Sequence, residues 1–211
     1  MKELYKKYIF LERFNNKNRG IKPLPIEEVT PRASSLIMSM RSLGYSFNNS
    51  IADILDNSIT AEANEIEIKC LWEGLEPIIE IKDNGKGMTL DELREAMRPG
   101  TYSPLQERSE EDLGRFGLGL KTASFSQCKR LIVTTTKNGK TFCAIWDLDK
   151  VEKENKWLLD LSECENSEQF RGTTIRWEKI DTLSKKDTQN GKENFENMIF
   201  NLSNHIGLTF Q

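Results

Sequence analysis

The order of the periodic segments is the feature that most constrains the fold of this chain. Helix-type spacing of apolar residues is concentrated in the first half, and after it four strand-like segments follow one another at residues 130–136, 141–147, 156–161 and 172–177. Asn138-Gly139, between the first two of these, is typical of a tight hairpin turn. Strands joined by turns pair antiparallel, which argues against a doubly wound parallel fold. We therefore predict an α+β, two-layer sandwich with a mixed, largely antiparallel sheet and helices on one face.

The first half is expected to hold two helices and a hairpin. Thr30-Pro31 supplies an N-cap and a first-turn proline for a helix that runs to about Gly44. A second helix starts near Ser46, and its apolar residues recur every three or four positions to form a core-facing stripe of Phe47, Ile51, Ile54, Leu55 and Ile59. Alternation of apolar and polar residues predicts two further strands, which pair as a hairpin, at residues 65–72 and 77–82.

Polar segments are expected to surround this core. A short helix at residues 89–97 precedes a charged, turn-rich stretch at residues 98–112, which we interpret as a lid. A last helix is expected at about residues 192–204. The basic and aromatic residues 1–30 read as an N-terminal arm, and residues 31–211 as the domain itself.

Composition narrows the function classes. The 211 residues carry a formal net charge of -3, which gives no global reason to bind nucleic acid or an anionic membrane. The chain shows neither a membrane-length apolar run nor the apolar core of a signal peptide at its start. Its four cysteines are widely spaced, so free thiols in a reducing compartment are favoured over a zinc site. We expect a cytoplasmic protein.

Asp53 and Asn57 form the first candidate motif. They stand four residues apart and therefore share one face of the second expected helix. A carboxylate and an amide oxygen placed in this way suit a water-orienting base beside a magnesium ligand, although such a pair is also common on a solvated helix face. Asp56 points about a hundred degrees away from Asn57 around the helix, which favours Asp53 as the base.

Glycines mark two further motifs. Asp83 ends a strand and is followed by Gly85 and Gly87, which would let the backbone approach a flat ligand while the carboxylate accepts a hydrogen bond from an exocyclic amine. A plain turn is the alternative for this segment. Farther on, three glycines lead into a helix start, where free N–H groups and the helix dipole favour phosphate; they are Gly114, Gly117 and Gly119. The surroundings of this glycine loop fit neither a Rossmann fingerprint nor a Walker loop.

Taken in order, these motifs resemble the GHKL ATPase superfamily, which includes DNA gyrase B, the ninety-kilodalton heat-shock chaperones, histidine kinases, MutL proteins and MORC ATPases. A fourth motif, Arg171-Gly172-Thr173-Thr174, stands where that family has a Gly-Thr supporting the adenine-bound aspartate. The resemblance implies the Bergerat ATP-binding fold. The sequence of residues 114–124 looks most like the MORC-type and chaperone-type lid.

The resemblance also implies roles for individual residues. Asn57 would bind Mg²⁺, Asp83 would read adenine, and Asp53 would be the catalytic base in place of the family's usual glutamate. The other residues assigned to the nucleotide are Gly85, Gly87, Met88, Gly114, Gly117, Gly119, Leu120, Lys121 and Thr173.

These assignments predict a function for the domain. It is expected to bind ATP or ADP with Mg²⁺ and to hydrolyse ATP slowly. Binding of Mg-ATP is expected to close the lid and to drive homodimerisation through the arm and lid. The alternative is a non-hydrolysing, nucleotide-gated clamp or interaction module. The chain is expected to be the N-terminal part of a longer protein, whose other regions would carry any nucleic-acid contact; no membrane contact is expected.

Overall fold

The structure is a computed structural model that describes residue 25 and residues 29–42, 44–73, 76–100, 119–164, 171–181 and 188–209. The chain divides into two units, Met1–Thr30 and Pro31–Gln211. Every described helix and strand lies in the second unit. None of the described helices combines the length and the apolar character needed to cross a bilayer.

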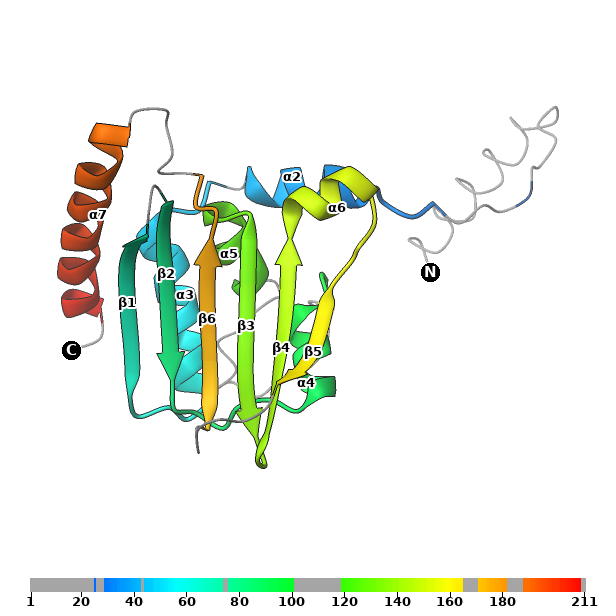
Figure 1. Ribbon diagram of the computed structural model, residues 1–211, viewed down its shortest axis with the longest axis horizontal. Helices are drawn as coiled ribbons and strands as arrows, with labels where there is room; N and C mark the ends of the chain where they lie inside the picture. Colours follow the sequence, from blue (N-terminus) through cyan, green and yellow to red (C-terminus); the bar gives the residue numbers. More distant parts are fainter. Residues whose placement is uncertain are drawn as a thin grey trace, which may run out of the picture. The chain divides into compact units, whose positions relative to one another are not determined.

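Six strands form one sheet in the spatial order β1-β2-β6-β3-β4-β5 (Figure 1). All described pairings are antiparallel. The last strand along the chain enters between two hairpins and joins them into one sheet. The strands are β1 (Ile66–Glu73), β2 (Glu76–Asp83), β3 (Arg130–Lys137), β4 (Lys140–Asp147), β5 (Asp160–Cys164) and β6 (Gly172–Glu178).

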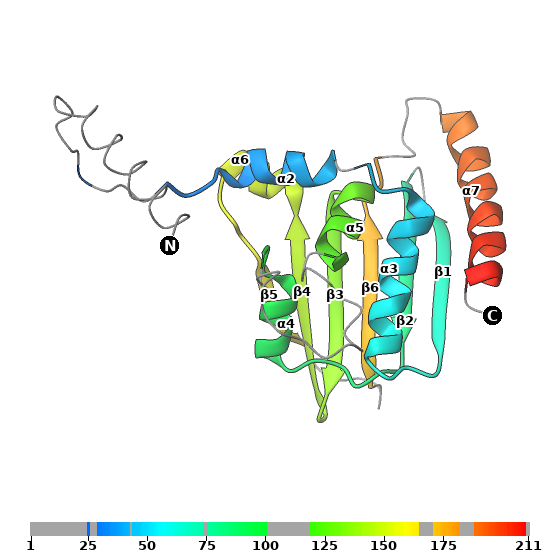
Figure 2. The same ribbon diagram turned by 180° about the vertical axis from the view of Figure 1, so that it is seen from behind.

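The helices cover one face of this sheet (Figure 2). Three of them, α3 (Phe47–Thr60), α4 (Leu90–Met97) and α5 (Gly119–Gln127), lie over this face, while α2 (Ala33–Arg41) and α6 (Leu148–Glu154) lie at one end of the sheet. The last helix, α7 (Thr188–Thr209), runs beside β1, where Phe195 packs on Trp72 with ring centroids 5.6 Å apart. The predicted α+β two-layer sandwich is confirmed.

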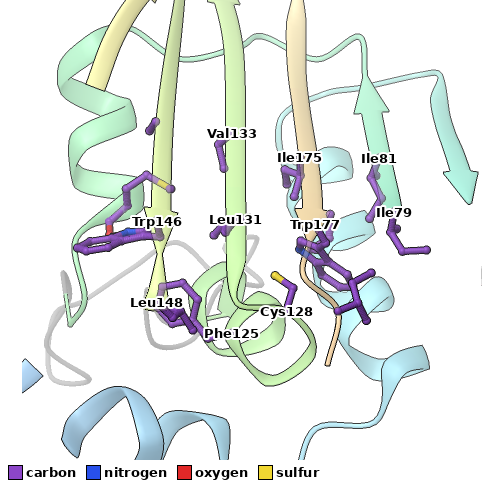
Figure 3. Packing of buried hydrophobic residues seen from close by; sticks show 14 of the residues in the cluster. Ile79, Ile81, Phe125, Cys128, Leu131, Val133, Trp146, Leu148, Ile175 and Trp177 are labelled. Carbon is purple, nitrogen blue, oxygen red and sulfur yellow. The ribbon is translucent and has the colours of Figure 1, made fainter. Parts of the chain in front are cut away.

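The core lies between the sheet and the helices (Figure 3). Trp146 and Trp177 are among its largest fully buried side chains, and burying an aromatic side chain of this kind stabilises a fold by roughly 1.5–3 kcal/mol. Their indole N–H groups are both hydrogen-bonded, to the carbonyl oxygen of Met97 at 3.0 Å and to Ser124 Oγ at 2.9 Å. These two hydrogen bonds therefore connect α4 and α5 to the sheet.

Helix α3 follows its expected pattern except in the last turn. Ser46 is the N-cap and accepts a hydrogen bond from the backbone N–H of Asn49 at 3.2 Å. The buried stripe runs through Ile51, Ile54 and Leu55. The prediction that Ile59 continues the stripe was wrong, because Ile59 is 46% exposed and Ser58 occupies the inward position of that turn.

The start of α2 also differs from the prediction. The helix begins at Ala33, and its N-cap is Arg32, which makes no side-chain capping bond. The side chain of Asn155 accepts a hydrogen bond from the backbone N–H of Ser34 instead, at 3.3 Å. A residue at the end of α6 thus supplies the cap that Thr30 was expected to provide.

Two later elements have shifted bounds. The strand expected at residues 156–161 is β5 at Asp160–Cys164, because pairing with β4 begins only at Asp160, while Trp157 and Leu159 pack on the core without pairing. The last helix starts earlier than expected, at Thr188, and includes Gly191. A Cβ atom at Gly191 would lie 3.2 Å from the ring of Trp72, so the glycine makes room for the tryptophan.

Candidate nucleotide-binding site

Three neighbouring strands each place a polar side chain at the same edge of the sheet. Asp83 on β2 is paired with Thr173 on β6, which is paired in turn with Thr135 on β3. Each ends an alternating stripe whose other members are apolar core residues, such as Ile81 before Asp83. All three are buried. The sheet register therefore creates a polar patch at the edge of an apolar core.

The Asp83 carboxylate is held by three donors. Its Oδ1 accepts hydrogen bonds from the backbone N–H groups of Gly85 at 2.9 Å and Thr173 at 3.2 Å. Its Oδ2 accepts one from the hydroxyl of Ser58 at 3.1 Å. Each carboxylate oxygen can accept two hydrogen bonds, so Oδ2 keeps capacity for one more donor from a ligand.

Two glycines allow the backbone to close around this carboxylate. Gly87 has φ +63°, and a Cβ atom there would collide with the carbonyl of Thr136. Gly172 has φ +127°, and a Cβ atom there would collide with the backbone of Asp83. Both positions favour glycine for its conformation as well as for the space it leaves. Gly172 was part of the fourth sequence motif but was not assigned to the site.

A second layer of hydrogen bonds fixes the neighbouring segment. Thr135 Oγ1 accepts a hydrogen bond from the backbone N–H of Met88 at 2.8 Å, and it lies 3.1 Å from Thr173 Oγ1. Ser58 and Thr135 were missed in the sequence. The signal was present in both cases, since Ser58 directly follows Asn57 and Thr135 interrupts a core-facing apolar stripe.

Asp83 opens into a cavity of about 300 Å³. Apolar side chains such as Val133, Ile175 and Leu120 contribute to its wall. A mostly apolar cleft with a few convergent polar groups is the usual form of a small-molecule site. The sequence-predicted residues that line it are Asn57, Asp83, Gly87, Met88, Gly119, Leu120, Lys121 and Thr173.

Of the remaining predicted residues, Gly85 and Asp53 are described and do not line this cavity. Gly85 is buried beside the cavity and contacts Asp83 through its backbone. Asp53 does not line this cavity; it lines a neighbouring hollow one helical turn away. Burial, and then the charge of Asp53, raise the pKa of Asp56. Gly114 and Gly117 lie outside the described residues.

Lys121 also lines the cavity. It lies in the first turn of α5 and is 2% exposed, and its Nζ donates a hydrogen bond to the carbonyl oxygen of Ala96 at 2.8 Å. Burial lowers the pKa of Lys121 to about 8, an effect that the charge of Glu95 partly offsets. The N-terminal N–H groups of α5 and this ammonium group together suit an anionic ligand.

Comparison with known proteins identifies the family. The family model for the histidine kinase-, DNA gyrase B- and HSP90-like ATPases matches residues 45–188, which is more than half of the chain and includes Asp83, Thr173 and Lys121. The chain belongs to this ATPase family. The resemblance found in the sequence motifs is thereby confirmed, and the protein is a GHKL-type ATP-binding domain.

Two relatives of this ATPase-family domain illustrate the similarity. It is 31% identical over 91 residues to the ATPase morc-1 of Caenorhabditis elegans, a match that covers 43% of this chain and 10% of the worm protein. It is 28% identical over 127 residues to the DNA mismatch repair protein MutL of Thermosipho melanesiensis, which covers 59% of this chain and 21% of that protein. The chain thus corresponds to a small part of each relative.

Proposed function

We propose that this domain binds Mg-ATP, with the adenine ring against Asp83 and the phosphates toward Gly119 and Lys121. The observation that carries this proposal is the Asp83 carboxylate, which is 5% exposed, is held by three protein donors and still faces a cavity. The exocyclic amine of adenine would donate the fourth hydrogen bond to Oδ2. Gly85, Gly87, Met88 and Thr173 would shape the adenine end.

Asn57 is the proposed magnesium ligand. It lines the cavity from the exposed side of α3, and its amide oxygen is a ligand type that Mg²⁺ accepts. The described residues contain no group of three or more His, Cys, Asp or Glu side chains that could hold a metal. This fits an ion held by one protein oxygen, phosphate oxygens and water, which is the usual arrangement for magnesium with a nucleotide. Magnesium bound there would neutralise phosphate charge.

Asp53 is the proposed base for hydrolysis. Its carboxylate would accept a proton from a water molecule while the water oxygen attacks the γ-phosphorus. The bond from the γ-phosphorus to the bridging oxygen would break, and ADP would leave with its electron pair. The N–H groups of the glycine loop and the ammonium group of Lys121 would stabilise the charge on the transferred phosphate. We expect turnover in this domain to be slow.

Lid closure and dimerisation complete the proposal. Residues 98–112 would act as the lid, with Gly114 and Gly117 contacting phosphate and residues 1–30 as an arm exchanged in a homodimer. Residues 101–118 lie outside the described part of the chain. The four cysteines form no disulfide, which suits the cytoplasmic location that we propose. Any nucleic-acid contact would come from regions outside this chain.

A nucleotide-gated clamp without hydrolysis is a second candidate. One observation favours it. Asp53 lines a hollow that is separate from the cavity lined by Asn57, and the two spaces share no lining residue. In a clamp, ATP would hold one conformation and Asp53 would be structural. Steady-state release of phosphate from Mg-ATP separates the two functions, since a clamp releases none.

The binding proposal is tested with Asp83→Asn. Isothermal titration with Mg-ADP and Mg-ATP should show saturable binding that the variant weakens by about tenfold or more, because an amide N–H would replace the acceptor that faces the adenine amine and the charge would be lost. Asp160→Asn on β5 makes the same chemical change in an exposed ion pair with Lys150 of α6, and this variant should bind as the wild type does. Equal binding by all three proteins would refute the assignment of Asp83.

A further inference from the structure

Glu95 places a second carboxylate on the wall of the cavity that Asp83 lines. It lies in the last turn of α4, and Ala96, Gly119 and Lys121 line the same cavity. In the function proposed above, Asp83 reads the adenine ring, whereas Glu95 has no part. A carboxylate on the wall of a site for an anionic ligand calls for a physical reason, because like charges repel.

The end of α4 brings Glu95 near the ammonium group of Lys121. Lys121 Nζ donates a hydrogen bond to the carbonyl oxygen of Ala96 at 2.8 Å, and Ala96 directly follows Glu95 in the chain. Burial lowers the pKa of Lys121, and the negative charge of Glu95 partly offsets this effect. One oxygen of Glu95 also lies 3.1 Å from a guanidinium nitrogen of Arg98. The carboxylate therefore lies on the part of the wall that we assign to the phosphates.

Helix α4 is held at both ends, which fixes the backbone at Glu95. Near its start, Glu92 accepts a hydrogen bond from Lys137 of β3 at 2.8 Å. At its end, the carbonyl oxygen of Met97 accepts one from Trp146 Nε1 at 3.0 Å. Only rotation of the Glu95 side chain can therefore change the distance between its carboxylate and a bound ligand.

We propose that Glu95 is a specificity-determining residue, which makes the cavity select the magnesium complex of a nucleotide over the metal-free nucleotide. This inference rests on the proposed function, in which the phosphates lie toward Gly119 and Lys121. The carboxylate of Glu95 repels the phosphates of a metal-free nucleotide. Magnesium cancels part of the phosphate charge and adds a cation that the carboxylate attracts. Asn57 would supply an oxygen to the ion, and Glu95 would penalise its absence.

The binding test uses ADP with excess magnesium and ADP with EDTA in place of magnesium, each in an isothermal titration. The wild type should bind the magnesium complex more tightly. Glu95→Gln keeps the size of the side chain and removes its charge, so we expect the Kd for metal-free ADP to fall about five- to tenfold, while the Kd for Mg-ADP changes by less than about twofold. Because the Glu95 side chain is 47% exposed, added salt should reduce the difference.

Two further variants separate this effect from other causes. Asp91→Asn removes the same charge from the same helix, but Asp91 is exposed, pairs with Arg94 and does not line the cavity. Both of its Kd values should match those of the wild type. Asn57→Ala should instead weaken the binding of Mg-ADP and leave that of metal-free ADP unchanged, because it removes the proposed magnesium ligand.

A second measurement needs no nucleotide. The NMR titration of the Lys121 side chain, assigned by its loss in Lys121→Met, should shift to lower pH in Glu95→Gln and stay in place in Asp91→Asn. An unchanged titration in Glu95→Gln overturns the role of Glu95, and so do two Kd values that change by the same factor in that variant. The proposed function survives either result if the wild type binds Mg-ADP. A wild type that binds neither form of ADP overturns the proposed function, and the selection with it.

Discussion

At the residue scale, the site contains two buried charged side chains, Asp83 and Lys121, and their surroundings differ. Asp83 has hydrogen-bond donors on both carboxylate oxygens. Lys121 is almost fully buried, donates to the carbonyl of Ala96, and has its pKa lowered to about 8 because burial disfavours the ammonium form. A buried cation on the wall of a cavity is stabilised when an anion enters. The buried ammonium group therefore suits the phosphate that we propose for this site, and its burial lowers the stability of the free protein.

The cost of burying Lys121 should appear as a dependence of the free energy of unfolding on pH. Because the pKa of Lys121 is about 8 in the folded state and 10.5 for an unperturbed lysine, the unfolded chain binds more protons between these values and the free energy of unfolding rises with pH there. Between pH 7 and pH 10 we expect the wild type to gain about 2 kcal/mol relative to Lys121→Met, measured by urea unfolding. If the difference in the free energy of unfolding between the two proteins stays constant with pH, folding does not lower the pKa of Lys121.

At the scale of elements, α5 connects the cavity to α2. Its first residue, Gly119, lines the cavity. At its other end Arg41 donates to the carbonyl oxygens of Phe125 at 2.6 Å and Cys128 at 2.9 Å, and it forms a two-oxygen pair with Asp181 at 2.6 Å. A guanidinium group at a helix C-terminus satisfies free carbonyls and complements the helix dipole.

Arg41→Met should therefore destabilise the domain. The side chains of Arg41 and Asp181 are 15% and 33% exposed, and removing the arginine would leave two carbonyls and a partly buried carboxylate without their donor. We expect a loss of about 2–4 kcal/mol in the free energy of unfolding by urea. Arg94→Met breaks the exposed pair with Asp91 and should cost less than about 1 kcal/mol. Similar losses in both variants would contradict the capping role.

At the scale of the whole molecule, the sheet, the helices and the cavity all belong to Pro31–Gln211. The predicted lid begins where α4 ends, and α4 is tied to the site because the carbonyl of Ala96 binds Lys121. A phosphate that competes for Lys121 would act on this attachment. We therefore expect the state of the nucleotide to reach the lid through α4 as well as through the glycine loop.

Hydrogen exchange can test this coupling. The proposed lid, residues 98–112, should be protected in the presence of a non-hydrolysable ATP analogue and much less so with ADP or no nucleotide, because in the proposed function only the γ-phosphate engages the glycine loop. Sedimentation of the same samples should show a dimer only with the analogue. Equal protection in all three states would refute gating by the γ-phosphate, and a monomer throughout would remove dimerisation from the function of this chain.

Local sequence patterns were sufficient to predict the features that depend on interactions between residues close in the sequence. The hairpin at Asn138 and Gly139 was predicted because its left-handed backbone angles, φ 54° and 74°, suit those two residues. The capping box at Thr89 and Glu92 marks the start of α4 for the same reason. The motif order also identified the family and eight residues that share one cavity.

Tertiary structure decided what depends on contacts between distant segments. Asn155 caps α2 across 121 residues, so the helix start could not be read from Thr30. Ser58 and Thr135 belong to the site because the sheet register and the packing of α3 bring them to Asp83 and Thr173. The placement of Asp53 in its own hollow with Tyr45 was decided in the same way. A sequence specifies which side chains share a face of one element, whereas the pairing of elements determines which faces meet.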